Sequence, residues 1–136
     1  MLSTKKEVDA LSYKIIGCSI EVHKNLGPGL LESVYEKCLI QELKLNGMKV
    51  DFQQRVPIEY KGVSLQADLR YDLLVEDIIV VELKAIENIL PIHEAVLLSY
   101  LKLLEKPKGI IINFHCTNIF HQGQKTLVNE YYQMLL

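Results

Sequence analysis

The sequence predicts an α/β fold in which a mixed β-sheet is flanked by helices and two helices precede the sheet. Apolar residues recur at helical spacing through roughly the first 46 residues. Short β-branched runs follow, and one further amphipathic segment precedes a last apolar run. This order, α-α-β-β-β-β-α-β, indicates helices packed against one sheet. The 136 residues fit a single domain covering 1–136.

Composition places the chain among ordinary globular proteins, with 24% charged and 49% apolar residues. The longest apolar run is far too short to cross a bilayer, and the N-terminus lacks the apolar segment of a signal peptide. We therefore expect a cytoplasmic protein without membrane contact. A net charge of −2 provides no global attraction to nucleic acid. Cys18, Cys38 and Cys116 lack metal-finger or disulfide spacing and are expected to be buried free thiols.

The first two elements have recognisable ends. Thr4 and Glu7 form a capping box, which predicts a helix from about residue 5 to 25. A Gly-Pro-Gly segment breaks it. A second helix is predicted from about 30 to 46, followed by Gly47 at the position of a left-handed cap.

Glu32 has an unusual place on the second helix. On a helical wheel it falls between Leu39 and Leu43, inside the apolar arc. Two interpretations remain open: a carboxylate directed toward a site, or a solvated residue at the edge of the arc.

The rest of the chain alternates between extended and helical patterns. Pro91 starts a third helix that ends near residue 106, and the strands on either side of it should be parallel in a right-handed β-α-β unit. The expected extended segments are 50–52, 55–60, 63–66, two runs within 72–84, 109–113 and 118–121, and the expected terminal helix is 127–135.

The segment 72–84 is the centre of the predicted sheet. Two β-branched runs flank Glu76-Asp77, the pattern of a hairpin, and the second run is apolar at every position, typical of a strand covered on both faces. That strand ends in Glu82 and Lys84, which share a face because they are two residues apart. Charges at the end of a buried strand cost several kcal/mol unless each has a partner.

Parity decides whether Asp72 joins these two charges. A two-residue loop would set residue 72 opposite 81, and Asp72 would then point away from Glu82. A three-residue loop or a bulge pairs 72 with 80 and brings Asp72, Glu82 and Lys84 to one face. We therefore predict an odd-length loop or a bulge. The three side chains suit a divalent cation and a water, or form an ordinary cross-strand ion pair on an exposed face.

Several motifs together resemble the GxxExxY protein family of the PD-(D/E)XK nuclease-like superfamily, over about residues 10 to 115. The resemblance implies a restriction-endonuclease-like fold. The motifs are His23, Leu26-Gly27-Pro28, Gly29-Leu-Leu-Glu32-Ser-Val-Tyr35, Asp72-Leu-Leu-Val, Val80-Val81-Glu82-Leu-Lys84-Ala, His93-Glu94-Ala95, Tyr100-Leu101-Lys102 and Ile112-Asn113-Phe114.

The resemblance implies a role for each matching residue. Asp72 and Glu82 would be the motif acids, Lys84 the motif lysine and Glu32 an extra acid from the N-terminal helix. A cation would be held by Asp72, Glu82 and the backbone carbonyl of Leu83, and Glu32 would either complete this ligand set or orient a water. Oxygen ligands suit Mg²⁺ or Mn²⁺, which polarises a phosphoryl oxygen and acidifies a bound water. Lys84 would hold that water or offset charge on phosphorus, and clustered carboxylates should raise a pKa.

Four residues are candidates for support. Tyr35, one turn from Glu32, either hydrogen-bonds to it or belongs to the core. His93 is either a donor to the site or a structural histidine. Tyr100 matches a family tyrosine, and Asp68 is a rival to the metal-binding aspartate with a poorer spacing. Val96 stands where the family commonly has glutamine.

The resemblance thus implies a Mg²⁺- or Mn²⁺-dependent nuclease that hydrolyses phosphodiester bonds in DNA or RNA. The alternative is a catalytically inactive module of the same fold that binds nucleic acid or a protein. Val96 and the absence of a basic surface favour this alternative. Apolar termini leave room for a homodimer.

Overall fold

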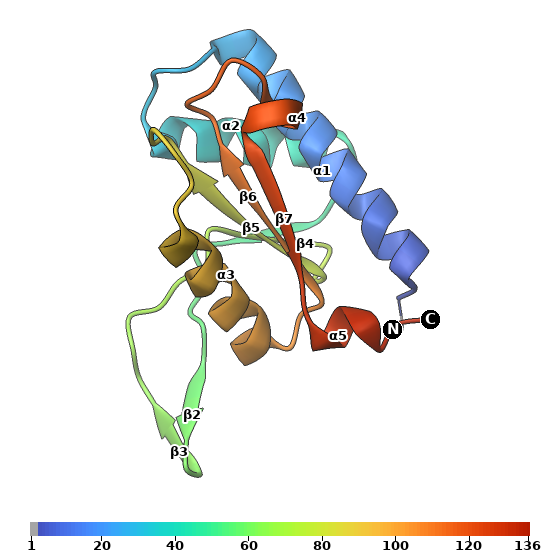
Figure 1. Ribbon diagram of the computed structural model, residues 1–136, viewed down its shortest axis with the longest axis vertical. Coiled ribbons are helices and arrows are strands. Elements are labelled where there is room, and N and C mark those ends of the chain that lie inside the picture. The colour runs from blue at the N-terminus through green and yellow to red at the C-terminus, as the bar shows by residue number, and fades with distance from the viewer. Residues whose placement is uncertain (1–2) are drawn as a thin grey trace.

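The computed structural model describes residues 3–136 and confirms the α/β fold: two helices precede a five-stranded mixed sheet of order β1-β4-β5-β6-β7, flanked by helices (Figure 1). The elements are α1 (Lys5–Leu26), α2 (Glu32–Leu45), β1 (Val50–Phe52), β2 (Ile58–Tyr60), β3 (Val63–Leu65), β4 (Leu73–Val75), β5 (Ile79–Lys84), α3 (Pro91–Leu104), β6 (Lys108–Asn113), α4 (Ile119–Gln122), β7 (Gln124–Val128) and α5 (Glu130–Gln133). The two N-terminal helices lie within two residues of their predicted bounds.

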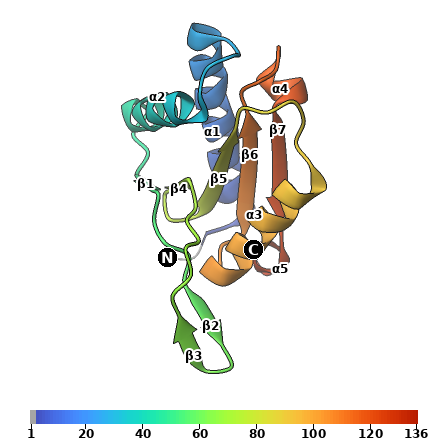
Figure 2. The same cartoon turned by 90° about the vertical axis from the view of Figure 1, so that its left-hand side faces the viewer.

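Helices cover both faces of the sheet. Helices α1 and α2 lie on one side and α3 on the other (Figure 2). The alternation of strand residues explains this arrangement: Leu73 and Val81 pack with the core under α1 and α2. Leu74 and Val80 pack with Leu97 of α3. Asp72, Glu82 and Lys84 have the parity of Leu74 and Val80 and therefore belong to the α3 face.

The β4–β5 hairpin has the odd-length loop that the sequence predicts. Val75 and Ile79 form its closing pair, so residues 76–78 make a three-residue loop. Glu76 and Asp77 have φ values of 53° and 56°. One detail of the expected register is wrong: Leu74, not residue 72, lies opposite Val80. Counting outward from the closing pair sets Asp72 opposite residue 82.

The β5-α3-β6 unit has the predicted parallel strands. A close approach sets the distance between α3 and the sheet. A Cβ atom added at Gly109 would lie 2.8 Å from Cδ1 of Leu97, so only glycine lets α3 pack this closely on β6. This contact also fixes the height of Val96 and Tyr100 above the sheet.

The prediction for the C-terminal part is wrong in two places. Residues 118–121 were expected to be extended, but α4 begins there because Asn118 caps it, its side chain accepting a hydrogen bond from His121 N–H at 2.9 Å. Residues 127–135 were expected to be helical, but β7 pairs with β6 and a short α5 follows. Pairing with β7 satisfies the backbone groups of the buried strand β6, which would otherwise be an edge.

Strands β2 and β3 form a separate two-stranded sheet that projects from the rest of the molecule (Figures 1 and 2). The turn between them contains Lys61 and Gly62, both with positive φ. Beyond these strands, the β1–β4 register resumes at an isolated bridge between Arg55 and Arg70.

Cys18 is buried, whereas Cys38 and Cys116 are half-buried, and all three are free thiols. Within residues 3–136, no helix is long and apolar enough to span a membrane.

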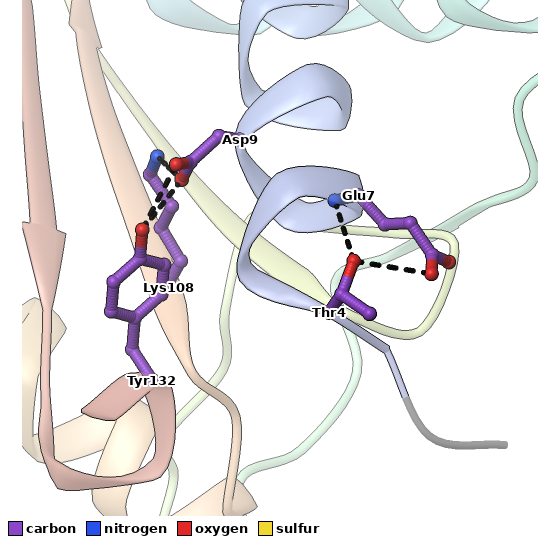
Figure 3. A network of polar contacts seen from close by, with 5 residues as sticks. All are labelled: Thr4, Glu7, Asp9, Lys108 and Tyr132. Atoms are coloured by element: carbon purple, nitrogen blue, oxygen red, sulfur yellow. Dashed lines mark hydrogen bonds and ion pairs between the residues drawn. The ribbon is translucent and has the colours of Figure 1, made fainter. Parts of the chain in front are cut away.

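A polar cluster joins α1, β6 and α5 (Figure 3). Lys108 Nζ lies 3.0 Å from Asp9 Oδ1, and the Tyr132 hydroxyl donates to the same carboxylate at 2.9–3.0 Å. Lys108 is only 9% exposed. Burial favours a higher pKa for Asp9, but the bonds from Lys108 and Tyr132 outweigh it and lower that pKa. Figure 3 also shows Thr4, whose Oγ1 accepts the N–H of Glu7 at 3.1 Å at the start of α1.

Replacing Asp9 tests the contribution of this cluster to stability. We expect Asp9→Asn to lower the free energy of unfolding by about 1–2 kcal/mol at pH 7, because the nearly buried Lys108 ammonium loses its anion. Lys108→Met should cost less, since an apolar side chain needs no partner. Urea denaturation measures both, with Glu59→Gln on the exposed strand β2 as control. Equal midpoints for Asp9→Asn and the wild type would contradict this account.

Candidate functional site

A row of polar side chains crosses three neighbouring strands on the α3 face. Continuing the β1–β4 register sets Gln53 opposite Asp72, and continuing the β4–β5 register sets Asp72 opposite Glu82. Both oxygens of Asp72 are held: Oδ1 accepts a bond from Gln53 Nε2 at 3.2 Å and Oδ2 from the N–H of Leu83 at 2.8 Å. Asp72 is therefore the fixed centre of the row.

This row opens into a cavity of about 210 Å³ between α2, the sheet and α3. Three acids that are far apart in the sequence line this cavity together with a lysine and an arginine. Larger cavities, of about 530 and 510 Å³, lie between α1 and α2 and beside β6 and β7, but the carboxylates of the row are not in them. The lining residues are Glu32, Arg70, Asp72, Glu82, Lys84, His93, Val96 and Tyr100.

Glu82 is the most perturbed group of the cavity. It is 9% exposed, and its Oε1 is buried without a hydrogen-bond partner among residues 3–136. Burial, followed by a hydrogen bond with Asp72 and the charge of Asp72, raises the pKa of Glu82 to about 10. The ammonium of Lys84 offsets this only in part. Without a cation, Glu82 is therefore protonated at pH 7.

Glu32 approaches the cavity from the first residue of α2. Its side chain is exposed at the rim, whereas Leu39 and Leu43 of the same helix are buried. Partial burial and the charge of Asp72 raise the pKa of Glu32, and Lys84 opposes the shift. Glu32 therefore lines the cavity, as the first interpretation expects, and is also exposed to solvent, as the second expects.

Two cationic side chains, Lys84 and Arg70, lie two residues further along the strands than Glu82 and Asp72. Lys84 is half-buried at the end of β5, and the register continued from the hairpin sets Arg70 opposite it. Arg70 donates to the carbonyl of Gln53 at 3.1 Å. We did not predict Arg70 from the sequence, although its parity with Asp72 was a signal that both share a face.

Leu83, between the two motif charges, points the other way. Its side chain belongs to the core under α1 and α2.

The structure places Tyr35 in the core and not at the cavity. Its ring is fully buried and stacks on Phe114 with 4.4 Å between centroids. Its hydroxyl donates to the carbonyl of Gly27 and accepts the N–H of Leu30 at 3.1 Å. Of the two interpretations for Tyr35, the core residue holds: it braces the loop that leads into Glu32 rather than bonding to Glu32.

Asp68 also stays outside the cavity. Its side chain is 89% exposed and lies 3.5 Å from Arg70 Nε.

Helix α3 contributes one wall of the cavity with His93, Val96 and Tyr100. Nδ1 of His93 accepts the N–H of Leu90 at 2.9 Å, so this nitrogen carries no proton and Nε2 carries one. His93 therefore caps α3 and keeps a donor. Burial and the charges of Glu82 and Asp72 raise the pKa of Tyr100, which keeps its hydroxyl protonated.

The donor set fits a hard cation that keeps part of its water shell. No three His, Cys, Asp or Glu side chains in residues 3–136 are arranged to hold a metal ion on their own. Mg²⁺, however, is usually bound through one or two carboxylates and several waters. Asp72 and Glu82 are two such carboxylates, and Oε1 of Glu82 is buried with no hydrogen-bond partner among residues 3–136. A cation would have to displace the proton of Glu82.

Replacing Glu82 tests its protonation. The unfolded chain loses this proton above pH 4.5, whereas the folded chain keeps it to about pH 10, so rising pH within this window favours unfolding. The cost at pH 7 is on the order of 3 kcal/mol. We expect Glu82→Gln to be more stable than the wild type at pH 7–8 and equally stable near pH 4.5, in thermal unfolding with chelator present. Glu76→Gln is the exposed control. A difference that does not change with pH would contradict this expectation.

Comparison with known proteins identifies the family. A family model described as the PD-(D/E)XK nuclease superfamily matches residues 9–126. We found no match among curated proteins or solved structures. The match covers most of the chain and includes every residue that lines the cavity. The nucleases of this superfamily generally use divalent metal ions, and the chain belongs to the PD-(D/E)XK nuclease superfamily.

Proposed function

We propose that this protein hydrolyses phosphodiester bonds in nucleic acid with a divalent cation held by Asp72 and Glu82. The observation that supports this best is the carboxyl pair itself, in which Glu82 is buried and Asp72 is half-buried. Glu82 has an unpartnered oxygen beside a second carboxylate, which is costly unless a proton or a cation is shared between them. A Lys84 ammonium in the same cavity adds the positive charge that phosphoryl transfer needs.

The remaining ligands would be oxygens as well. The carbonyl of Leu83 is the backbone candidate, since Leu83 N–H already bonds to Asp72 and holds this stretch of β5 beside it. Glu32, at the rim, is better placed to act through a bound water than directly. All these donors suit Mg²⁺ or Mn²⁺.

The cation, when bound, supplies a polarised phosphoryl oxygen and a more acidic water. The chain's own groups do the rest. Lys84 would offset the charge that develops on phosphorus. Arg70, with a planar guanidinium, would hold a non-bridging oxygen of the phosphate. Tyr100 and Nε2 of His93 are neutral donors for the same group.

The segment Gly29–Tyr35 supports membership of the GxxExxY family as the finer assignment. Its glutamate and tyrosine do different things in the structure. Glu32 lines the cavity, whereas Tyr35 stacks in the core and holds the preceding loop. The glutamate of the motif would thus serve the site and its tyrosine the stability of the fold, which gives both named residues of the motif a role.

One observation favours the second candidate, an inactive module that binds nucleic acid or protein. Val96 lines the cavity where the family commonly has glutamine, so this position on the α3 wall offers no hydrogen bond to a substrate. Such a module would bind a cation without turnover.

Cleavage assays distinguish the two candidates. With Mg²⁺ or Mn²⁺ we expect cleavage of single- or double-stranded DNA or of RNA, and a rate at least about 100-fold lower in Asp72→Ala and Lys84→Ala. The exposed Glu21→Ala on α1 is the control. Cleavage that persists in both cavity variants would exclude this site, and binding without any cleavage would favour the inactive module.

Cation binding should release a proton. Because Glu82 is protonated up to about pH 10, Mn²⁺ must displace its proton at pH 7. We expect the affinity to rise with pH between 6 and 8, by up to about tenfold per unit. Calorimetry in two buffers of different ionisation enthalpy counts the released protons. Binding that is independent of pH and buffer would contradict displacement at Glu82.

A further inference from the structure

Gln53 has a backbone conformation that glutamine rarely adopts. It follows β1 directly and has a φ of 51°, in the left-handed region. Glycine or asparagine adopts this region at lower cost. Strained positions of this kind cluster at functional sites. The backbone conformation alone would favour glycine or asparagine at this position, so the reason for a glutamine must lie in the contacts of its side chain.

The polar groups of Gln53 converge on the candidate site. Its backbone N–H bonds to the carbonyl of Asp72 at 2.9 Å, and its own carbonyl accepts from Arg70 at 3.1 Å. Its Nε2 donates to two carboxylates, Glu36 Oε1 at 2.9 Å and Asp72 Oδ1 at 3.2 Å. Gln53 is thus bonded to Arg70 and Asp72, which precede strand β4, and to Glu36 of helix α2.

A carboxamide is the side chain that suits this position. Its NH₂ group has two hydrogens, one for each carboxylate. It joins the two acids without adding a charge, whereas a lysine here would compete with a cation for Asp72. Glu36 lies one turn after Glu32 on α2, so the bridge also sets how far the acids of α2 stand from Asp72.

We infer that Gln53 is a positioning residue for Asp72: its carboxamide fixes the Asp72 carboxylate and ties it to α2. This inference rests on the proposed role of Asp72 as a cation ligand. Leu83 N–H holds Oδ2 and Gln53 holds Oδ1, so rotation of the carboxylate would break both bonds. Each oxygen keeps a second lone pair for a cation. Loss of such a supporting bond at metal sites costs about 10–100-fold in affinity.

The variant Gln53→Gly distinguishes a role of the side chain in positioning Asp72 from a role of the residue in forming the turn. Glycine relieves the left-handed backbone and removes the carboxamide. We expect an unchanged or higher Tm, with Mn²⁺ binding weakened about 10–100-fold by calorimetry. Without metal, the Leu83 amide should exchange hydrogen faster in NMR, because its acceptor Asp72 is no longer held. Gln53→Asn keeps the turn but is one methylene too short, and should behave in the same way.

Gln54→Ala is the matched control, since the neighbouring glutamine bonds to the Phe52 carbonyl at 2.9 Å and not to Asp72. It should change neither Mn²⁺ affinity nor Leu83 exchange. If the wild type binds Mn²⁺ and both Gln53 variants bind it equally well, the inference is overturned while the proposed function stands. If the wild type itself binds no Mn²⁺, the proposed function fails, and this inference with it.

Discussion

The site depends on two carboxyl groups that face each other across adjacent strands of a buried sheet. Burial of Glu82 and the neighbouring charge of Asp72 disfavour ionisation of Glu82 and raise its pKa to about 10. Such a pair persists only with a proton or a cation between its members. The ammonium of Lys84 in the next row lowers the pKa of Glu82 but does not outweigh burial and the charge of Asp72.

The fold serves to keep this pair in register. The three-residue loop of the β4–β5 hairpin sets the parity that puts Asp72 and Glu82 on one face. Gly109 allows α3 to pack close to that face, so that its side chains form the opposite wall of the cavity. The stacked Tyr35 holds the loop before α2, and Glu32 thereby reaches the rim.

Local patterns were enough to predict α1, α2 and α3, the odd-length hairpin loop and the shared face of Glu82 and Lys84. They failed where pairing over long distances decides the structure. Gln53 becomes a neighbour of the site only through the β1–β4 ladder, which no local spacing reveals. The C-terminal part was misjudged for a related reason: β7 exists because β6 needs a partner, not because its own sequence alternates strongly.

The protonation of Glu82 followed by carbon-13 NMR, with and without Mg²⁺, tests most directly whether this carboxyl pair is a cation site. We expect its carboxyl signal in the metal-free protein to stay that of the acid from pH 5 through 8, and to shift to that of a carboxylate at pH 7 when Mg²⁺ is added. A carboxyl that titrates near its ordinary value of 4.5, or that ignores Mg²⁺, would contradict the cation site.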